Sequence, residues 1–277
     1  MYPVNLPEFV YTVLLRPTPL RRLANACLRR LVPPVLDRGG AKVVLNPLDP
    51  VVSGALTLGV YENDEIAFFR QHFRKGMTFV DVGANVGLYT ALALRGEAGR
   101  VLAVEPHKET FAYLGKTVAA NFPRCPVALE NLAVGAATGE MVLWSNPNNK
   151  GDNRLYADPM LADSQPTQVE TLDALCLRQG IAAVDFLKID VQGAELLVLE
   201  GAQKILRASR QCIVMAEFWP EGIRRCGGDP GRYFELFSSA GIELKEMVGR
   251  HLREVDPTRL IRETRGRCYR NLVGFGV

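Results

Sequence analysis

Residues 78–90 read Thr-Phe-Val-Asp-Val-Gly-Ala-Asn-Val-Gly-Leu-Tyr-Thr, a buried-strand pattern that runs into a glycine turn and then into a helix. Residues 77–82 are apolar and β-branched enough for a central parallel strand, and residues 88–94 continue with apolar helix formers. Gly83 and Gly87 allow the backbone between them to bend tightly and to approach a ligand. The stretch therefore predicts a ligand-binding turn between a strand and a helix.

The glycine turn departs from the pattern that binds a dinucleotide. A G-x-G-x-x-G turn uses its second glycine to admit a pyrophosphate, and Asn85 stands at that position here. The Asn85 side chain would crowd a diphosphate. Asp81, at the end of the strand, adds a negative charge that repels a diphosphate and attracts a cationic ligand. Together the two residues favour S-adenosylmethionine as the cofactor.

A second acidic residue supports a nucleoside cofactor. Residues 100–106 predict the next strand, which ends in Glu105. A carboxylate at a strand end can accept hydrogen bonds from both ribose hydroxyls, and Glu105 follows Asp81 at about the 20-residue spacing expected for one strand-helix-strand step. The ribose of NAD would be bound in the same way, so only the glycine pattern discriminates between the two cofactors.

Several short motifs follow one another along the chain. They are Asp-Pro-Val-Val-Ser-Gly from Asp49, Asp-Val-Gly-Ala-Asn-Val-Gly from Asp81, Val-Glu-Pro from Val104, Phe-Leu-Lys-Ile-Asp-Val-Gln-Gly-Ala-Glu from Phe186, and Ala-Glu-Phe-Trp-Pro from Ala216. In this order they resemble the FkbM family of class I S-adenosylmethionine-dependent methyltransferases. The resemblance runs from about Asp49 to the C-terminus. It implies O-methylation of a hydroxyl on a sugar or secondary metabolite, with adenine contacts at Asn131, Leu132 and Ala133.

The order strand, helix, strand, helix, strand from residue 77 onward is the signature of an α/β fold. Further strands are expected over residues 127–134, 140–145, 184–191 and 212–218, with an antiparallel pair around 242–248 and 268–277. We expect a doubly wound, Rossmann-like, seven-stranded and mostly parallel sheet, as in class I methyltransferases. Residues 41–277 would form this domain, with a hairpin of residues 42–45 and 54–59 at its start, and residues 1–40 a helical N-terminal extension.

The N-terminal extension has an apolar helical face. Its members are Leu20, Leu23, Cys27, Leu28 and Leu31. The apolar run at residues 9–15 is far shorter than the roughly 20 residues that span a bilayer, and the charges follow it instead of preceding it as in a signal peptide. The helix would pack on the domain, on a second copy in a homo-oligomer, or weakly on a membrane surface. These three alternatives stay open.

Composition excludes some classes of partner. The net charge is +3, and the basic residues are spread over most of the chain, so there is no electrostatic footprint for nucleic acid. A small-molecule acceptor is the expected partner. The six cysteines include no C-x-x-C pair and predict reduced thiols in a cytoplasmic protein, and 48% hydrophobic and 23% charged residues are ordinary for a globular domain.

Two further carboxylates lie at the edge of the sheet where ligands of open α/β folds bind. Asp190 ends the strand expected over 184–191, and Glu217 ends the one over 212–218. Lys188 precedes Asp190 on the same face of the strand, so an ion pair would keep Asp190 ionised. Asp190 would serve as a base, bind a divalent cation with Glu217, or receive the cofactor's amino group. A buried Lys188–Asp190 pair that only orders the strand end is the alternative.

Residues 146–165 are polar and irregular, and a loop of this length inside a compact domain suggests a lid. Asp152, Asn153 and Arg154 at its centre are candidates for binding a polar substrate, with Trp219 as wall material. A solvated loop with Asx turns is the alternative. His107 is expected to be an exposed first-turn residue of a helix.

Two other functions compete with methyl transfer. An NAD-dependent oxidoreductase or epimerase is opposed by Asn85 and by the lack of a Tyr-x-x-x-Lys pair. A non-catalytic partner subunit is opposed by the intact set Asp81, Gly83, Gly87, Glu105 and Asp190. Metal dependence stays open, because the candidate ligands are carboxylates, which would suit Mg²⁺ as readily as no metal.

Overall fold

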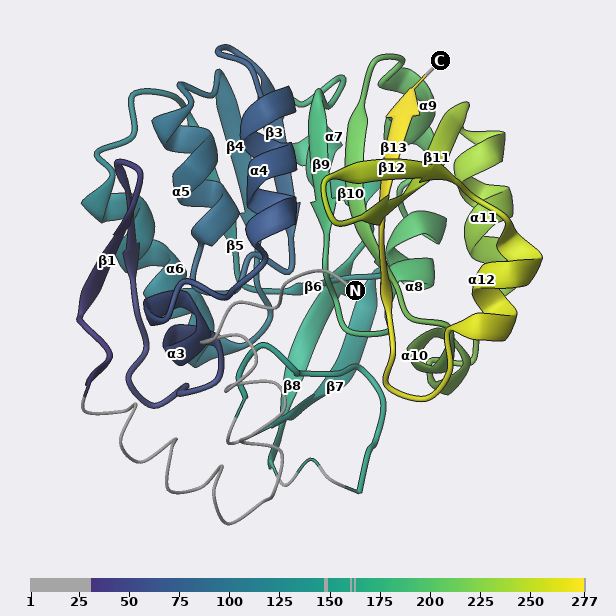
Figure 1. The fold of residues 1–277 in the computed structure, drawn as a ribbon, viewed down its shortest axis with the longest axis horizontal. Coiled ribbons are helices and arrows are strands. Elements are labelled where there is room, and N and C mark those ends of the chain that lie inside the picture. Colours follow the sequence, from purple (N-terminus) through teal and green to yellow (C-terminus); the bar gives the residue numbers. More distant parts are fainter. Residues whose placement is uncertain (1–30, 147–148, 160, 162, 277) are drawn as a thin grey trace.

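The computed structural model describes residues 31–146, 149–159, 161 and 163–276. Its centre is an eight-stranded sheet with the order β12-β11-β13-β10-β9-β3-β4-β5 (Figure 1). The run from β10 to β5 is parallel, and β13, β11 and β12 extend it as antiparallel strands. The chain moves from β3 outward to β5 on one side and from β9 to β10 on the other, so the strand order reverses between β3 and β9.

The elements have the following bounds. The strands are β1 Val35–Arg38, β2 Ala41–Val44, β3 Thr78–Val82, β4 Arg100–Val104, β5 Val127–Glu130, β6 Ala133–Val134, β7 Gly139–Ser145, β8 Asp163–Glu170, β9 Phe186–Ile189, β10 Ile213–Phe218, β11 Ile242–Val248, β12 His251–Glu254 and β13 Arg270–Gly276. The helices are α3 Val52–Thr57, α4 Asn63–His72, α5 Leu88–Arg95, α6 Lys108–Ala120, α7 Leu172–Arg178, α8 Glu195–Glu200, α9 Gln203–Ala208, α10 Pro220–Arg225, α11 Pro230–Ser239 and α12 Pro257–Glu263.

Helices cover both faces of the main sheet. Phe79 and Val101 face α4, α5 and α6, whereas Val80 and Leu102 face α7, α8, α9 and α11. Strand β3 is buried on both faces, as its apolar and β-branched residues predict. The predicted doubly wound, mostly parallel α/β sheet is confirmed, with one strand more than expected.

A small second sheet has the order β6-β8-β7 and lies beyond the carboxyl ends of the parallel strands, toward the bottom of Figure 1. Strand β8 begins at Asp163, so the predicted irregular loop is shorter than the sequence indicates. The loop also folds back on its own sheet, because Trp144 and Arg154 form an isolated antiparallel bridge. This sheet places the loop over the carboxyl edge of the main sheet.

The predicted hairpin near the start of the domain is wrong in its second strand. Strand β2 pairs with β1 through the turn at Gly39 and Gly40, and residues 52–57 form helix α3. The Asp49 carboxylate accepts from the backbone N–H of Val51 and of Val52, both at 3.2 Å, and so helps begin that helix. The predicted helical extension falls mostly on residues 1–30, outside the described part, and its last part contains strand β1. Among the helices of the described part, none is long and apolar enough to cross a membrane.

Candidate functional site

A cavity of about 370 Å³ lies at the carboxyl edge of the sheet, where the strand order reverses. Open α/β sheets bind their ligands at this point. Its lining includes Gly83 and Asn85 after β3, Glu105 and Pro106 after β4, Leu132 to Val134 after β5, Asp190 to Gln192 after β9, Glu217 in β10, Tyr61 and Glu62 before α4, and Leu143, Asn149 to Gly151, Asn153 and Leu155 from the small sheet and its loop.

The turn after β3 requires glycine at its first position. Gly83 has φ +82°, and a Cβ there would lie 1.9 Å from the backbone oxygen of Asp190. Asp190 in turn donates its backbone N–H to the carbonyl of Val82 at 3.0 Å. The two strand ends therefore touch through their backbones, and this contact forms the floor of the cavity.

Glu105 lines the cavity and also holds the glycine turn. Its carboxylate accepts from the backbone N–H of Asn85 and of His107, both at 2.9 Å. Burial raises the pKa of Glu105 to about 7, against the lowering effect of these two hydrogen bonds. Contrary to the expectation, His107 is buried, and its ring caps α6 by accepting from the N–H of Thr110.

Three of the predicted cofactor residues do not line the main cavity. Asp81 is buried beneath the turn and accepts a hydrogen bond from the Thr90 hydroxyl at 2.7 Å. Gly87 begins α5 with φ +90°, and a Cβ there would come within 2.8 Å of Leu114. Asn131 donates its amide to the carbonyls of Glu105 and Pro106. These three residues support the elements around the cavity without lining it. The predicted cofactor residues that do line it are Gly83, Asn85, Glu105, Leu132, Ala133 and Asp190.

The three predicted catalytic residues come together at the ends of β9 and β10. Lys188 Nζ lies 3.0 Å from Asp190 Oδ2. Burial opposes the charge of Lys188, but the carboxylates of Asp190, Glu62 and Asp81 outweigh it and raise the pKa. Glu217 is almost fully buried, and burial, followed by the Asp190 charge, raises its pKa well above the ordinary value.

Gln192 connects two of these carboxylates, and the sequence did not single it out. Its amide Nε2 donates to Asp190 Oδ1 at 2.9 Å and to Glu217 Oε2 at 3.2 Å. The residue has φ +52°, which is unusual for a side chain other than glycine. Gln192 could have been identified as a site residue from its position in the sequence, because it follows Asp190 by two residues in the turn after the strand.

Glu62 is a second residue that the sequence reasoning missed. It lines the cavity from the turn before α4, with φ +45°, and accepts a hydrogen bond from the Tyr89 hydroxyl at 2.7 Å. Burial raises its pKa, while Lys188 opposes the shift. Backbone strain of this kind is often found at functional sites.

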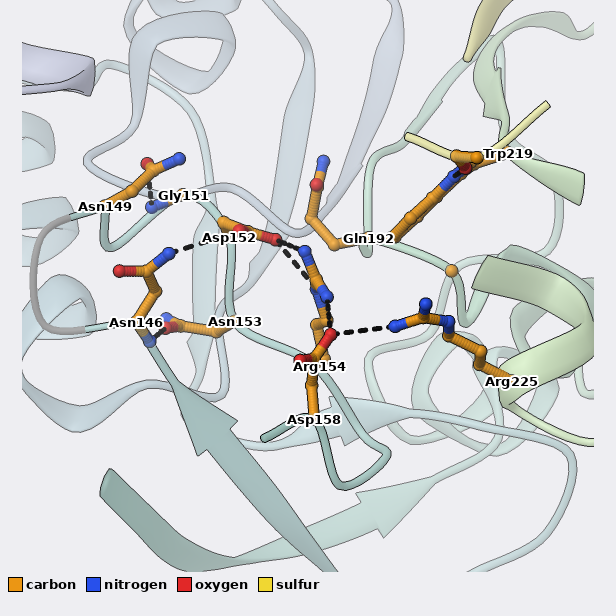
Figure 2. A network of polar contacts seen from close by, with 12 residues as sticks. Asn146, Asn149, Gly151, Asp152, Asn153, Arg154, Asp158, Gln192, Trp219 and Arg225 are labelled. Carbon is orange, nitrogen blue, oxygen red and sulfur yellow. Dashed lines mark hydrogen bonds and ion pairs between the residues drawn. The ribbon is translucent and has the colours of Figure 1, made fainter. Parts of the chain in front are cut away.

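The loop candidates form an internal network (Figure 2). Arg154 is buried and binds Asp152, with Nη2 2.6 Å from Oδ1, and also binds Asp158. Arg225 reaches Asp158 at 2.9 Å. The Arg154 guanidinium stacks over Trp219, 5.0 Å from the ring centroid. Asp152, Arg154 and Trp219 therefore hold the loop in place and do not line the cavity, whereas Asn153 does.

The same loop closes one side of the cavity. A Cβ on Gly151 would lie 2.8 Å from Val52 and 3.1 Å from the Asn85 amide, so the loop packs directly on α3 and on the glycine turn. Lys150 adds a cation to the wall. Within the described residues, no group of three or more His, Cys, Asp and Glu side chains is placed to hold a metal ion, so a divalent cation, which the sequence leaves open, finds no support.

Comparison with known proteins identifies the family. The family model described as the methyltransferase FkbM domain matches residues 81–241. The chain is similar to "Methyltransferase sdnD" of Sordaria araneosa, with 27% identity over 175 residues that cover 52% of this chain and 68% of that protein.

Solved structures with partial similarity include a TehB-like SAM-dependent methyltransferase from Corynebacterium glutamicum, with TM-score 0.43 and 12% identity over 81% of this chain and 93% of that one. Another is M. jannaschii TYW2 in complex with AdoMet, with TM-score 0.44 and 10% identity over 87% of this chain and 83% of that one. The family assignment rests on the sequence match, which spans more than half of the chain. The protein is a methyltransferase and belongs to the family that carries the FkbM methyltransferase domain.

Proposed function

We propose that this methyltransferase moves the methyl group of S-adenosylmethionine to a hydroxyl group of a small molecule such as a sugar or a secondary metabolite. The proposal rests on the placement of Glu105 and Asp190, which follow the two strands that flank β3 and line one cavity. A ligand that joins a ribose to an amino acid and lies across the Gly83 turn would contact both carboxylates.

The residues around the cavity fit this cofactor. Glu105 would accept hydrogen bonds from the ribose hydroxyls, and Leu132 and Ala133 offer apolar surface to the adenine. The methionine part would then extend toward Asp190. Asn85 occupies the position where a dinucleotide site needs glycine, which supports S-adenosylmethionine over NAD.

S-Adenosylmethionine supplies an activated methyl group, so the chain mainly has to hold an acceptor hydroxyl in line with it. Lys188 and Gln192 each donate to a different oxygen of Asp190, which fixes the orientation of the carboxylate. Asp190 would accept the hydroxyl proton as the acceptor oxygen bonds to the methyl carbon, and the electron pair of the broken carbon–sulfur bond stays on sulfur.

An acceptor screen with one variant tests this proposal. The full chain is incubated with S-adenosylmethionine and a panel of sugars and aliphatic or aromatic alcohols, and S-adenosylhomocysteine is measured by mass spectrometry. Asp190→Asn should still bind S-adenosylhomocysteine, although more weakly than the wild type, and should lose turnover by about 10² or more. Asp64→Asn, which removes a carboxylate from α4 outside the cavity, is the matched control. Wild-type turnover in Asp190→Asn would remove Asp190 from this role.

A further inference from the structure

The cavity has a surplus of acidic side chains. Glu62, Glu105, Asp190 and Glu217 line it, and Lys150 is the one Lys or Arg among its described lining residues. Glu105 can be assigned to a ribose and Asp190 to the transfer itself. Glu62 and Glu217 then have no function in the proposed reaction.

The surplus is concentrated at one end of the cavity. Glu62, Asp190 and Glu217 are shared with a small cavity of about 40 Å³, which Lys188 also lines. Gln192 bridges Asp190 and Glu217, so these two carboxylates face the same space. Lys188 pairs with Asp190 at 3.0 Å and is close enough to Glu62 and Glu217 to act on their charge, so three carboxylates share one ammonium group. This end of the site can therefore take up a further positive charge.

The charged and titratable groups around Glu62 and Glu217 come from every element packed against them. They are Lys188 and Asp190 of the β9 end, Glu195 of α8, Tyr89 of α5, Glu65 of α4, Tyr61 before α4, Tyr233 of α11 and Tyr269 before β13. Lys188 is the only cation in this set. Burial, and then the charge of Asp190, raises the pKa of both carboxyl groups, against the lowering effect of Lys188.

We propose that Glu62 and Glu217, with Asp190, recognise the positive charge of the donor's methylsulfonium group, so that the site prefers the charged donor to its uncharged thioether product. This inference rests on the proposed function. S-Adenosylmethionine and S-adenosylhomocysteine differ only in the methyl group and its charge. Transfer removes the charge that the carboxylates recognise, and this weakens the binding of the product and favours its release.

Isothermal titration of the full chain with three ligands tests the inference. The ligands are S-adenosylmethionine, S-adenosylhomocysteine, and sinefungin, in which a carbon that bears a protonated amine replaces the sulfonium. The two cationic ligands should bind about tenfold more tightly than the neutral thioether at pH 7.5. They should also release more protons, measured in phosphate and in Tris, because a bound cation favours the ionised form of Glu62 and Glu217.

The variants Glu62→Gln and Glu217→Gln separate this role from a structural one. Each should reduce the preference for the cationic ligands about threefold or more and leave the affinity for S-adenosylhomocysteine within about twofold. Asp64→Asn removes the same charge from outside the cavity and should keep the preference.

The outcomes are distinguishable. Equal affinity and equal proton release for all three ligands, or a preference that survives in both variants, would overturn the inference and leave the proposed function intact. Binding of none of the three ligands by folded protein would instead contradict the proposed function. If neither variant folds, the wild type still provides a test, because its preference for S-adenosylmethionine should decline as the pH falls from 8 to 5 and the carboxylates take up protons. A constant preference over that range would overturn the inference.

Discussion

The backbone oxygen of Asp190 lies 1.9 Å from the position that a Cβ on Gly83 would occupy. This contact joins β3 to β9 at the point where the strand order reverses, so the glycine turn and the proposed catalytic carboxylate depend on each other's position. No side chain fits between them, and the floor of the cavity is therefore formed by backbone.

Gly83→Ala should damage both stability and binding. The alanine would have to adopt φ +82° and would overlap the Asp190 carbonyl, so we expect a loss of at least about 2 kcal/mol in the free energy of unfolding and of S-adenosylhomocysteine binding. Gly115→Ala in α6 is the control, since a Cβ there meets nothing within 4 Å and should stabilise the helix by about 0.5–1 kcal/mol. Urea unfolding and calorimetry measure both effects. Unchanged unfolding of Gly83→Ala would contradict the close packing described here.

Glu105 should make stability depend on pH. Its pKa is raised from 4.5 to about 7 in the folded protein. The protonated Glu105 therefore contributes to the free energy of unfolding below pH 4.5, and this contribution is lost as the pH rises through 7. The expected loss is on the order of 3 kcal/mol. Urea unfolding between pH 4.5 and 8 should show this slope in the wild type and a smaller one in Glu105→Gln. Glu140→Gln, on an exposed carboxylate, should keep the wild-type slope. Identical slopes in Glu105→Gln and the wild type would show that Glu105 is not the group responsible.

Gln192→Glu should destabilise the protein more at pH 8 than at pH 5. The new carboxylate would stand where the amide now donates to Asp190 and Glu217, at 2.9 and 3.2 Å. It would remove two hydrogen bonds and add repulsion, with an expected loss of about 1–3 kcal/mol at pH 8 that shrinks at pH 5 as the cluster is protonated. Thermal melting at the two pH values measures the difference. Gln71→Glu, on an exposed residue of α4, should melt like the wild type at both.

Arg154→Met should weaken the packing of the loop, although Arg154 itself does not line the cavity. Arg154 is buried, pairs with Asp152 and Asp158, and stacks on Trp219. Removing one member of a buried ion pair costs about 3–5 kcal/mol, and the affinity for S-adenosylhomocysteine should also fall because Asn153 and Leu155 line the cavity. Arg232→Met breaks only an exposed ion pair on α11 and should cost less than about 1 kcal/mol. If Arg154→Met bound the ligand as tightly as the wild type, the loop would not be needed for the site.

The strands of the core could be predicted from sequence because their residues are buried on both faces. Strand β3 is one example. The paired strands β11 and β13 were also predicted, although most residues of β11 are half-buried or exposed. Strand β12 escaped prediction because all four of its residues are exposed, so burial left no apolar pattern to find. The sequence predicts a strand over residues 54–59, but the hydrogen bonds from the backbone N–H groups of Val51 and Val52 to Asp49 help begin helix α3 there instead.

The site was predictable where a side chain follows a central strand. Glu105, Asp190 and Glu217 lie at the carboxyl edge as expected. Glu62 could not be found in this way, because it reaches the cavity from a turn outside the sheet. Arg154 was expected in the cavity, but its charge is taken up by two aspartates of its own loop, a pairing that depends on how the loop folds.

S-Adenosylmethionine as the cofactor is tested first by two isothermal calorimetric titrations of the purified protein, one with S-adenosylhomocysteine and one with NADH. We expect binding of S-adenosylhomocysteine at micromolar concentration and no binding of NADH. Tight binding of NADH, or failure of a cooperatively melting protein to bind S-adenosylhomocysteine, would contradict it.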